Sequence, residues 1–126
     1  MAQYENYKVI SLVAQSAIAS SGVCVEANAA GAFNCSTANA DTDRPLGVSM
    51  EAAAAAGDAV GVAIAGIVVV TSGAAIAIGD QVAPDAAGKA RTAASGDSMC
   101  GTALQAASGA DESISILLGY QGQVIE

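Results

Sequence analysis

The chain contains no histidine and no tryptophan, and its single phenylalanine is Phe33. Histidine is the commonest general base near neutral pH and the commonest protein metal ligand, so its absence removes the usual serine triad and many metal sites. A serine–lysine pair is disfavoured as well, because Lys8 and Ser11 lie three residues apart on an expected strand and face opposite ways. The sequence therefore predicts a protein that is not an enzyme and that needs no cofactor.

Positive charge is also scarce, since four Lys and Arg residues oppose twelve Asp and Glu residues and give a formal net charge of −8. Nucleic-acid binding and anionic membrane surfaces both require clustered Lys and Arg, so neither partner is expected. Asp41, Asp43 and Glu51 could offer carboxylates to a hard cation, but the surrounding residues do not complete a calcium-binding loop. We interpret them as a solvated acidic region and predict no metal site.

The three cysteines, Cys24, Cys35 and Cys100, match no zinc or redox motif, and an odd number is not a disulfide framework. We expect them to be small buried hydrophobic residues in a reducing compartment. A Cys24–Cys35 bridge between neighbouring strands stays open as the alternative. Residues 1–7 lack the basic start and apolar core of a secretory signal, so none is expected.

An uncharged run from Ala59 to Gly79 is long enough to cross a bilayer as a helix. Its pattern favours strands instead, because Val60, Val62 and Ile64 alternate with smaller residues and glycines divide the run into strand-sized pieces. Acidic residues flank the run at both ends, without the Lys or Arg that would orient a membrane helix. We therefore expect paired strands here and no membrane span.

Short alternating runs, separated by Gly-Asp and similar turn pairs, recur along the chain. This spacing predicts an all-β fold, either a small β-barrel or a jelly-roll-like sandwich. Glu51–Ala56 has high helix propensity but is too short for a stable helix, so we expect a turn-like connector there. Residues 1–8 are expected to form an extended N-terminal arm, and residues 9–126 a single β domain. The expected strands are 7–14, 22–26, 33–37, 45–48, 59–65, 67–72, 75–78, 80–83, 88–94, 99–106 and 113–119.

The arm region holds two of the three tyrosines, Tyr4 and Tyr7, in a chain otherwise poor in aromatic residues. Aromatic side chains are typical anchors of protein interfaces, so Tyr4, Glu5, Asn6 and Tyr7 are the predicted contacts with a partner protein or with a neighbouring protomer. The alternative, which stays open at this stage, is that Tyr7 only closes the end of a barrel.

An ordered series of short motifs follows residue 45 and carries a family resemblance. It runs Pro45-Leu-Gly-Val, Gly57-Asp-Ala-Val, Gly66-Ile-Val-Val, Ile78-Gly-Asp-Gln-Val, Gly88-Lys-Ala, Gly101-Thr-Ala-Leu and Ile114-Ser-Ile-Leu-Leu. Taken together, the series resembles the capsid cement, or head decoration, proteins of tailed bacteriophages. One departure is Cys100, which stands where that family tends to have Ile and which keeps the position apolar.

This resemblance implies a β-barrel or jelly-roll-like body, usually a homotrimer, on the outer surface of the virion capsid. The expected partner is the major capsid protein, whose subunits such a protein bridges and stabilises. The arm, with Tyr4, Glu5, Asn6 and Tyr7 as its contacts, is expected to extend onto the capsid or the next protomer. A self-assembling component of a virion tail or shell is the alternative. An enzyme or small-ligand module is disfavoured, because the chain lacks the residues for a polar reactive pocket.

Overall fold

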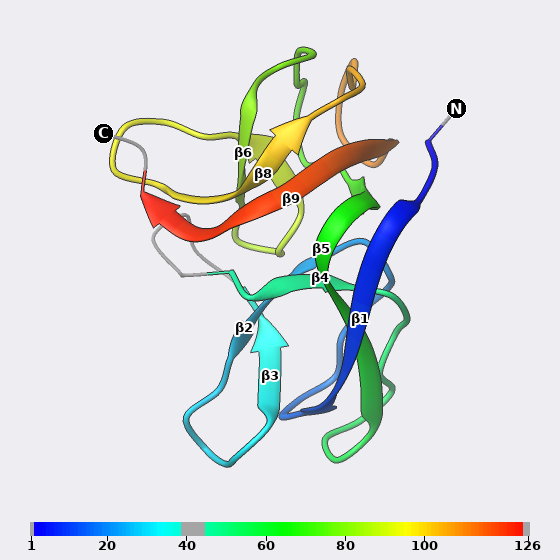
Figure 1. The fold of residues 1–126 in the computed structure, drawn as a ribbon. Coiled ribbons are helices and arrows are strands. Elements are labelled where there is room, and N and C mark those ends of the chain that lie inside the picture. Colours follow the sequence, from blue (N-terminus) through cyan, green and yellow to red (C-terminus); the bar gives the residue numbers. More distant parts are fainter. Residues whose placement is uncertain (1, 39–44, 125–126) are drawn as a thin grey trace.

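The computed structural model describes residues 2–38 and 45–124, and all regular secondary structure in this part of the chain is β-strand. The strands form one mixed sheet in the order β1-β3-β2-β4-β5-β9-β8-β6-β7. An additional pairing of β1 with β5 curls the first half of the sheet into a partial ring, which is not a regular barrel (Figure 1). The predicted all-β fold class is confirmed. The strands are β1 (Glu5–Ala14), β2 (Cys24–Ala27), β3 (Asn34–Thr37), β4 (Gly47–Ser49), β5 (Ala59–Thr71), β6 (Gln81–Pro84), β7 (Ala90–Thr92), β8 (Ser98–Ala103) and β9 (Ser113–Val124).

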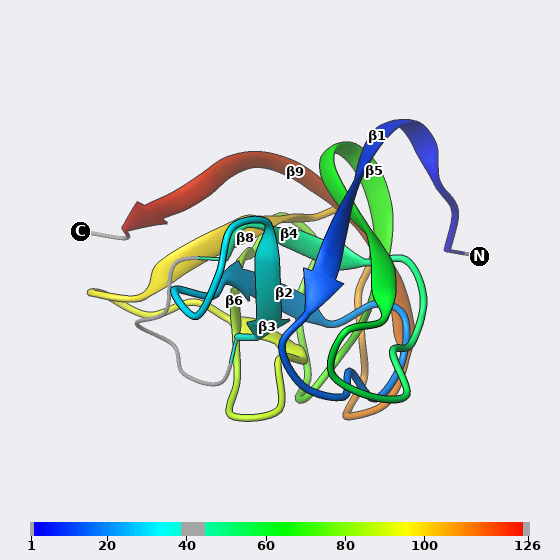
Figure 2. The same ribbon diagram turned by 90° about the horizontal axis from the view of Figure 1, so that it is seen from below.

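Strand β5 passes through both halves of the molecule. Residues 59–65 pair with β4 and with most of β1, whereas residues 66–71 pair with β9 (Figures 1 and 2). The strand bends at Gly66, whose φ of +92° is accessible to glycine at little cost. We call β1–β4 with residues 59–65 the N-terminal lobe, and residues 66–71 with β6–β9 the C-terminal lobe.

The predicted strands 59–65 and 67–72 are therefore one continuous, bent strand. The uncharged run that begins at Ala59 contributes to the sheet, and no helix among the described residues has the length and apolar character needed to cross a membrane. Residues 75–78 form no strand, because Ile76 makes only an isolated bridge to Ala107. Strand β1 begins at Glu5, earlier than the predicted start at Tyr7, so part of the expected arm belongs to the sheet.

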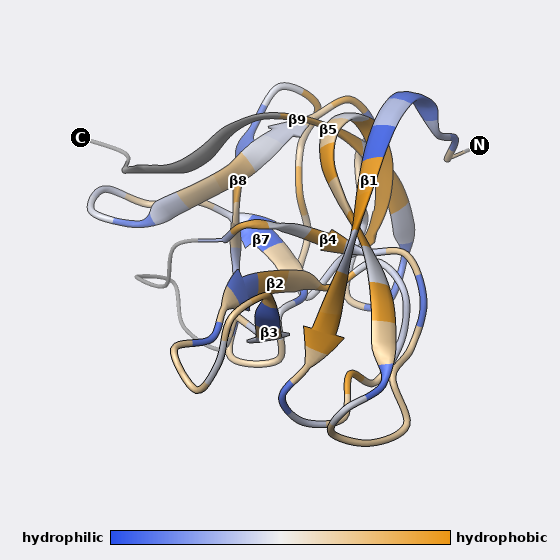
Figure 3. Cartoon of the chain, turned by 60° about the horizontal axis from the view of Figure 1, so that its bottom comes forward, coloured by the Kyte–Doolittle hydropathy of each residue, from blue (hydrophilic) through white to orange (hydrophobic). Residues whose placement is uncertain are grey.

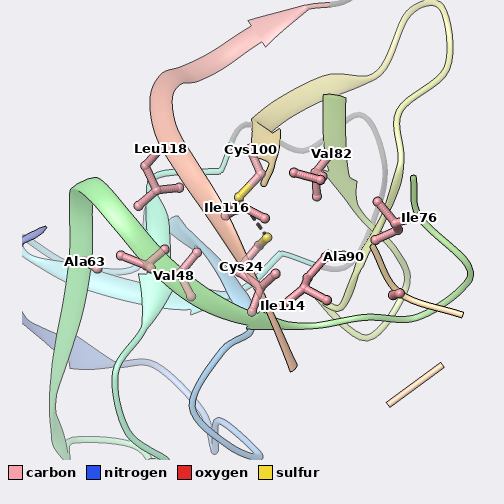
Figure 4. Packing of buried hydrophobic residues seen from close by; sticks show 14 of the residues in the cluster. Cys24, Val48, Ala63, Ile76, Val82, Ala90, Cys100, Ile114, Ile116 and Leu118 are labelled. Carbon is pink, nitrogen blue, oxygen red and sulfur yellow. Dashed lines mark hydrogen bonds between the residues drawn. The ribbon is translucent and has the colours of Figure 1, made fainter. Parts of the chain in front are cut away.

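The core consists of small apolar side chains in two clusters, one for each lobe. In the N-terminal lobe, Leu12, Val25 and Val62 are buried together. In the C-terminal lobe, the buried side chains include Val70 and Ile116, and the same cluster reaches into the N-terminal lobe. Figure 4 shows this second cluster, in which residues of β2, β4 and β5 pack against those of β8 and β9. The lobes therefore share a core and are joined by more than the strand that they have in common.

Three Gly-Asp pairs form equivalent turns before strands. In each turn the Asp N–H donates to the carbonyl three residues earlier, and the Asp carboxylate accepts a backbone N–H bond from within the same turn. The connector Glu51–Ala56 leads into the first of them and forms no helix, as predicted. The recurring sequence pair thus marks a repeated local structure. The pairs are Gly57-Asp58, Gly79-Asp80 and Gly96-Asp97.

Candidate binding surface

The N-terminal arm lies against the body of the molecule and is held by residues far away in the sequence. The Ser115 hydroxyl accepts a hydrogen bond from the Gln3 N–H at 2.7 Å and donates one to the Gln3 carbonyl at 2.9 Å. The chain then crosses Gly66, where an added β-carbon would lie 2.3 Å from the Asn6 carbonyl oxygen. The missing side chain at this position lets the arm approach β5, so that the arm is positioned on its own protomer.

All four residues predicted to contact a partner are exposed on this arm. The rings of Tyr4 and Tyr7 lie 5.4 Å apart between centroids, and they form a pair on the outside of the molecule. Tyr7 is 44% exposed, which does not fit the alternative that it closes the end of a barrel. Partial burial, with a smaller effect of Tyr7, raises the pKa of Tyr4, so its hydroxyl remains a hydrogen-bond donor near neutral pH.

The outer edge of β1 carries backbone groups that no neighbouring strand uses. The Val13 N–H donates to the Phe33 carbonyl at 2.8 Å, where β3 begins beside β1. Because backbone groups alternate along a strand, those of Val9 and Ser11 point to the same side as those of Val13. Among the described residues no strand pairs with this side of β1 before Val13, so the edge at Val9 and Ser11 is open.

The side chains beside this open edge are mostly apolar, with Ser11 as the exception. Val9 and Val13 are both exposed, and the second half of β1 is correspondingly coloured hydrophobic in Figure 3. Phe33 is the last residue of the loop between β2 and β3, and its side chain is 77% exposed. Its φ of +59° is unusual for a bulky residue, so the chain keeps an aromatic ring at a strained and solvent-facing position. We call Tyr4, Tyr7, Val9, Val13 and Phe33, together with the open edge, the β1 surface.

A shallow hollow adjoins the arm on the C-terminal lobe. Its volume is about 240 Å³, and it is lined by the apolar Ile67 and Leu104 and by the polar Gln105, Ser115, Gln3 and Glu5. Leu104 is exposed, and so is Leu117, which pairs with Ile67 across β5 and β9. The apolar surface therefore continues from the arm onto the C-terminal lobe.

Positive charge is dispersed over the described residues. Lys89 forms an ion pair with Asp111, and the hydrogen bond from this partner raises the pKa of the lysine. Arg91 pairs with Asp97 at 2.9 Å on the C-terminal lobe. Lys8, the other cation among the described residues, is exposed on β1. The paired cations lie on the C-terminal lobe, and β1 carries no charged side chain from Val9 to Ala14.

No group of three or more potential metal ligands occurs among the residues that the structure describes. Glu51 instead accepts a hydrogen bond from the Gly61 N–H at 3.2 Å, and Asp41 and Asp43 lie outside the described residues. These carboxylates are therefore not gathered into a metal site within the part of the chain that the structure describes.

The cysteines are not arranged as the alternative of a Cys24–Cys35 bridge requires. All three cysteines are free and buried, and the hairpin register places Cys35 opposite Ala27, not opposite Cys24. Cys24 and Cys35 belong to different core clusters, so the Cys24–Cys35 bridge is not formed. The sulfur that Cys24 meets belongs to Cys100, at 3.0 Å.

Most of the β1 surface was not predicted from the sequence. Phe33 was assigned to a strand, although it lies exposed at the end of the hairpin loop, and the open edge depends on where β3 begins beside β1. The only available signal was that the single phenylalanine follows an Asn-Ala-Ala-Gly turn. The structure thus has an all-β body with one long, exposed strand edge that is uncharged from Val9 to Ala14.

Comparison with known proteins gives the family. The chain belongs to the phage cement protein family, which it matches over residues 4–118, and the resemblance seen in the sequence is confirmed. It is therefore a structural, non-enzymatic component of the virion at the capsid surface. No curated protein gives a significant sequence match.

A solved structure shares the fold. The head fibre gp8.5 N base of bacteriophage phi29 aligns with a TM-score of 0.71 at 17% sequence identity, covering 93% of this chain and 98% of that chain. At this identity the likeness shows the fold alone. The alignment extends over both lobes, so the arrangement of partial ring and second sheet half occurs in another protein from a phage head.

Proposed function

We propose that this cement protein decorates the head of a tailed phage as a homotrimer and stabilises it by bridging neighbouring subunits of the major capsid protein. The β1 surface makes the contact, with Tyr4, Glu5, Asn6 and Tyr7 of the arm at one end and Phe33 at the other. The single observation that supports this assignment best is that exposed aromatic residues, exposed valines and an open strand edge all occur on β1 or directly beside it.

The affinity for the capsid is expected to arise from several contacts that are each weak. An extended capsid segment can pair with the backbone of Val9 and Ser11 by strand addition, while apolar side chains cover Val13 and Phe33. A trimer presents three such surfaces, so once the first has bound, the others bind as intramolecular events at high effective concentration. A protein with a net charge of −8 and no catalytic centre suits this role, because affinity comes from shape and apolar contact.

The rival function is a self-assembling tail or shell component, and the assembly state distinguishes the two. Size-exclusion chromatography with light scattering should give a discrete soluble trimer of the purified chain. Large open polymers would favour the rival instead, since head-to-tail contacts that do not close produce filaments. A stable monomer would contradict the proposed trimer, but it would not contradict capsid binding, which is tested separately.

Capsid binding is tested with undecorated capsids and a double variant of the arm. Tyr4→Ala with Tyr7→Ala removes two exposed rings, so folding should be retained while binding falls by about tenfold or more, as for interface hot spots. Ile78→Ala is the matched control, because Ile78 is exposed to 71% and lies on a turn of the C-terminal lobe. Wild-type binding of the tyrosine variant, or equal loss in the control, would contradict the assigned arm contact.

A further inference from the structure

Two buried cysteines from opposite halves of the chain meet in the shared core. The sulfur atoms of Cys24 and Cys100 lie 3.0 Å apart, and the two residues are separated by 76 positions in the sequence (Figure 4). A disulfide bond is about 2.05 Å long, so the sulfurs need to approach by only about 1 Å. We propose that Cys24 and Cys100 form a disulfide that fastens the N-terminal lobe to the C-terminal lobe.

The surrounding backbone allows this small approach. Cys100 lies where the β8–β9 register shifts between Met99 and Gly101, and a bulge of this kind redirects a side chain and relaxes the local ladder. Cys24 is fixed more firmly, because its N–H donates to the Gly88 carbonyl and its own carbonyl accepts from Ala38. The movement that closes the bond is therefore expected on the β8 side.

Bond formation proceeds by thiol–disulfide exchange with a low-molecular-weight disulfide such as oxidised glutathione. One cysteine thiolate attacks this disulfide and releases one glutathione thiolate, and the second cysteine then attacks the mixed disulfide and releases the other. The two cysteine protons pass to the departing thiolates, so the cysteines are oxidised and the reagent is reduced. The hydrogen bond with Cys100 and burial raise the pKa of Cys24 well above its ordinary value, which makes the reaction slow in the closed core.

The timing of closure rests on the proposed function. A phage head is built inside a reducing host cytoplasm and released into an oxidising medium, so the pair should be two thiols during assembly and a disulfide in the free virion. The bond would then stabilise the decoration protein after the stage at which it must fold. Cys35 has no cysteine neighbour and is expected to stay a thiol throughout.

The test uses the purified full-length chain, oxidised glutathione and mass spectrometry. The oxidised protein should lose the mass of two hydrogens and, after unfolding, alkylate at one cysteine instead of three. Its thermal midpoint should rise on the order of 10 °C over the reduced protein, because the bond closes a long loop. Cys35→Ala, which keeps the pair, should behave like the wild type, whereas Cys100→Ala should form no internal bond.

Three thiols that all alkylate after oxidation, stable glutathione adducts, or a bond that includes Cys35 would each overturn the proposal. These outcomes are read on the wild-type protein, so a variant that fails to fold does not obscure them. The bond forms without any capsid, so its absence leaves the capsid-binding test untouched, and failed capsid binding leaves the bond itself untouched. Extracting decoration protein from released virions with an alkylating agent present then checks the timing.

Discussion

The two strands at the edges of this sheet, β1 and β7, differ in how far their outer backbone groups are covered. Strand β7 (Ala90–Thr92) is short, and its first residue is already covered, because the Gly73 N–H donates to the Ala90 carbonyl. Its last carbonyl accepts a hydrogen bond from the Arg91 guanidinium at 3.0 Å, and Arg91 is itself paired with Asp97. Strand β1 is longer, mostly exposed and apolar along its second half, and nothing among the described residues covers its outer side before Val13.

This difference supports β1 as the edge that the proposed contact uses. Natural sheets protect their edges by short strands and charged side chains, since an open apolar edge pairs readily with other chains. The chain protects β7 with both devices, whereas β1 is long and carries no charged side chain from Val9 to Ala14. The exposed, strained Phe33 beside β1 fits the same reading, because strain of this kind persists where a function requires it.

The largest expected effect comes from proline at two neighbouring positions of β1. Ser11→Pro removes an N–H on the open side, which an edge strand tolerates, whereas Ile10→Pro removes one that faces β5. We expect Ile10→Pro to destabilise the fold by about 3 kcal/mol or more and Ser11→Pro to leave it folded. Chemical denaturation checks this difference in stability.

The same pair of variants tests the edge as a binding site. Folded Ser11→Pro should fail to decorate capsids, because the ring blocks the donor that an added strand would use. If Ser11→Pro binds capsids as the wild type does, strand addition at β1 is ruled out, although side-chain contacts at the arm could still be measured separately.

A smaller effect is expected from breaking the protection of β7 with Asp97→Asn. The Ala94 N–H bond, assisted by Arg91 and opposed by burial, lowers the pKa of Asp97 in the folded protein. A lowered pKa stabilises the fold above the unfolded-state pKa, and this contribution is lost as pH falls through the folded-state value. Asp97→Asn should thus cost about 1–2 kcal/mol at neutral pH.

Urea denaturation over a pH series checks the Asp97 prediction. The difference between wild type and Asp97→Asn should remain constant above the ordinary aspartate range and shrink as the solution becomes more acidic than that. A difference that is independent of pH would show that the ionised carboxylate is not what shields this edge.

The smallest effect on stability is expected at Phe33. Phe33→Asn relieves the positive φ, because Asn tolerates this backbone region, and should raise stability by about 0.5–1 kcal/mol. The same change removes the exposed ring and should weaken capsid binding. Stability and binding measured on one preparation check both signs, and a loss of stability would mean that the ring packs in a way its exposure does not suggest.

Much of the fold could be predicted because it depends on local pattern. Alternating valines placed β5, and the Gly-Asp pairs placed turns that the structure shows to be equivalent. Gly66 was recognised as a break, but a glycine at positive φ can bend a strand without ending it, and local pattern does not separate these cases. The start of β1 was missed, because its first pairings depend on β5, far along the chain.

The candidate site was harder to predict, because its parts are distant in sequence. The tyrosines of the arm were identified from composition, yet their support by Ser115 joins positions 112 residues apart. The meeting of Cys24 with Cys100 depends likewise on how two halves of the sheet share one core. Contacts of this kind follow from topology and leave no spacing signal.

The measurement that tests the central claim most directly is amide hydrogen exchange of the protein, free and bound to capsids. If the open edge of β1 is the binding site, the amides of Val9 and Ser11 should exchange rapidly in the free protein and become protected on the capsid. Those of Arg91 and Thr92 on β7 should not change. Unchanged exchange at Val9 and Ser11 in saturated, decorated capsids would contradict the account.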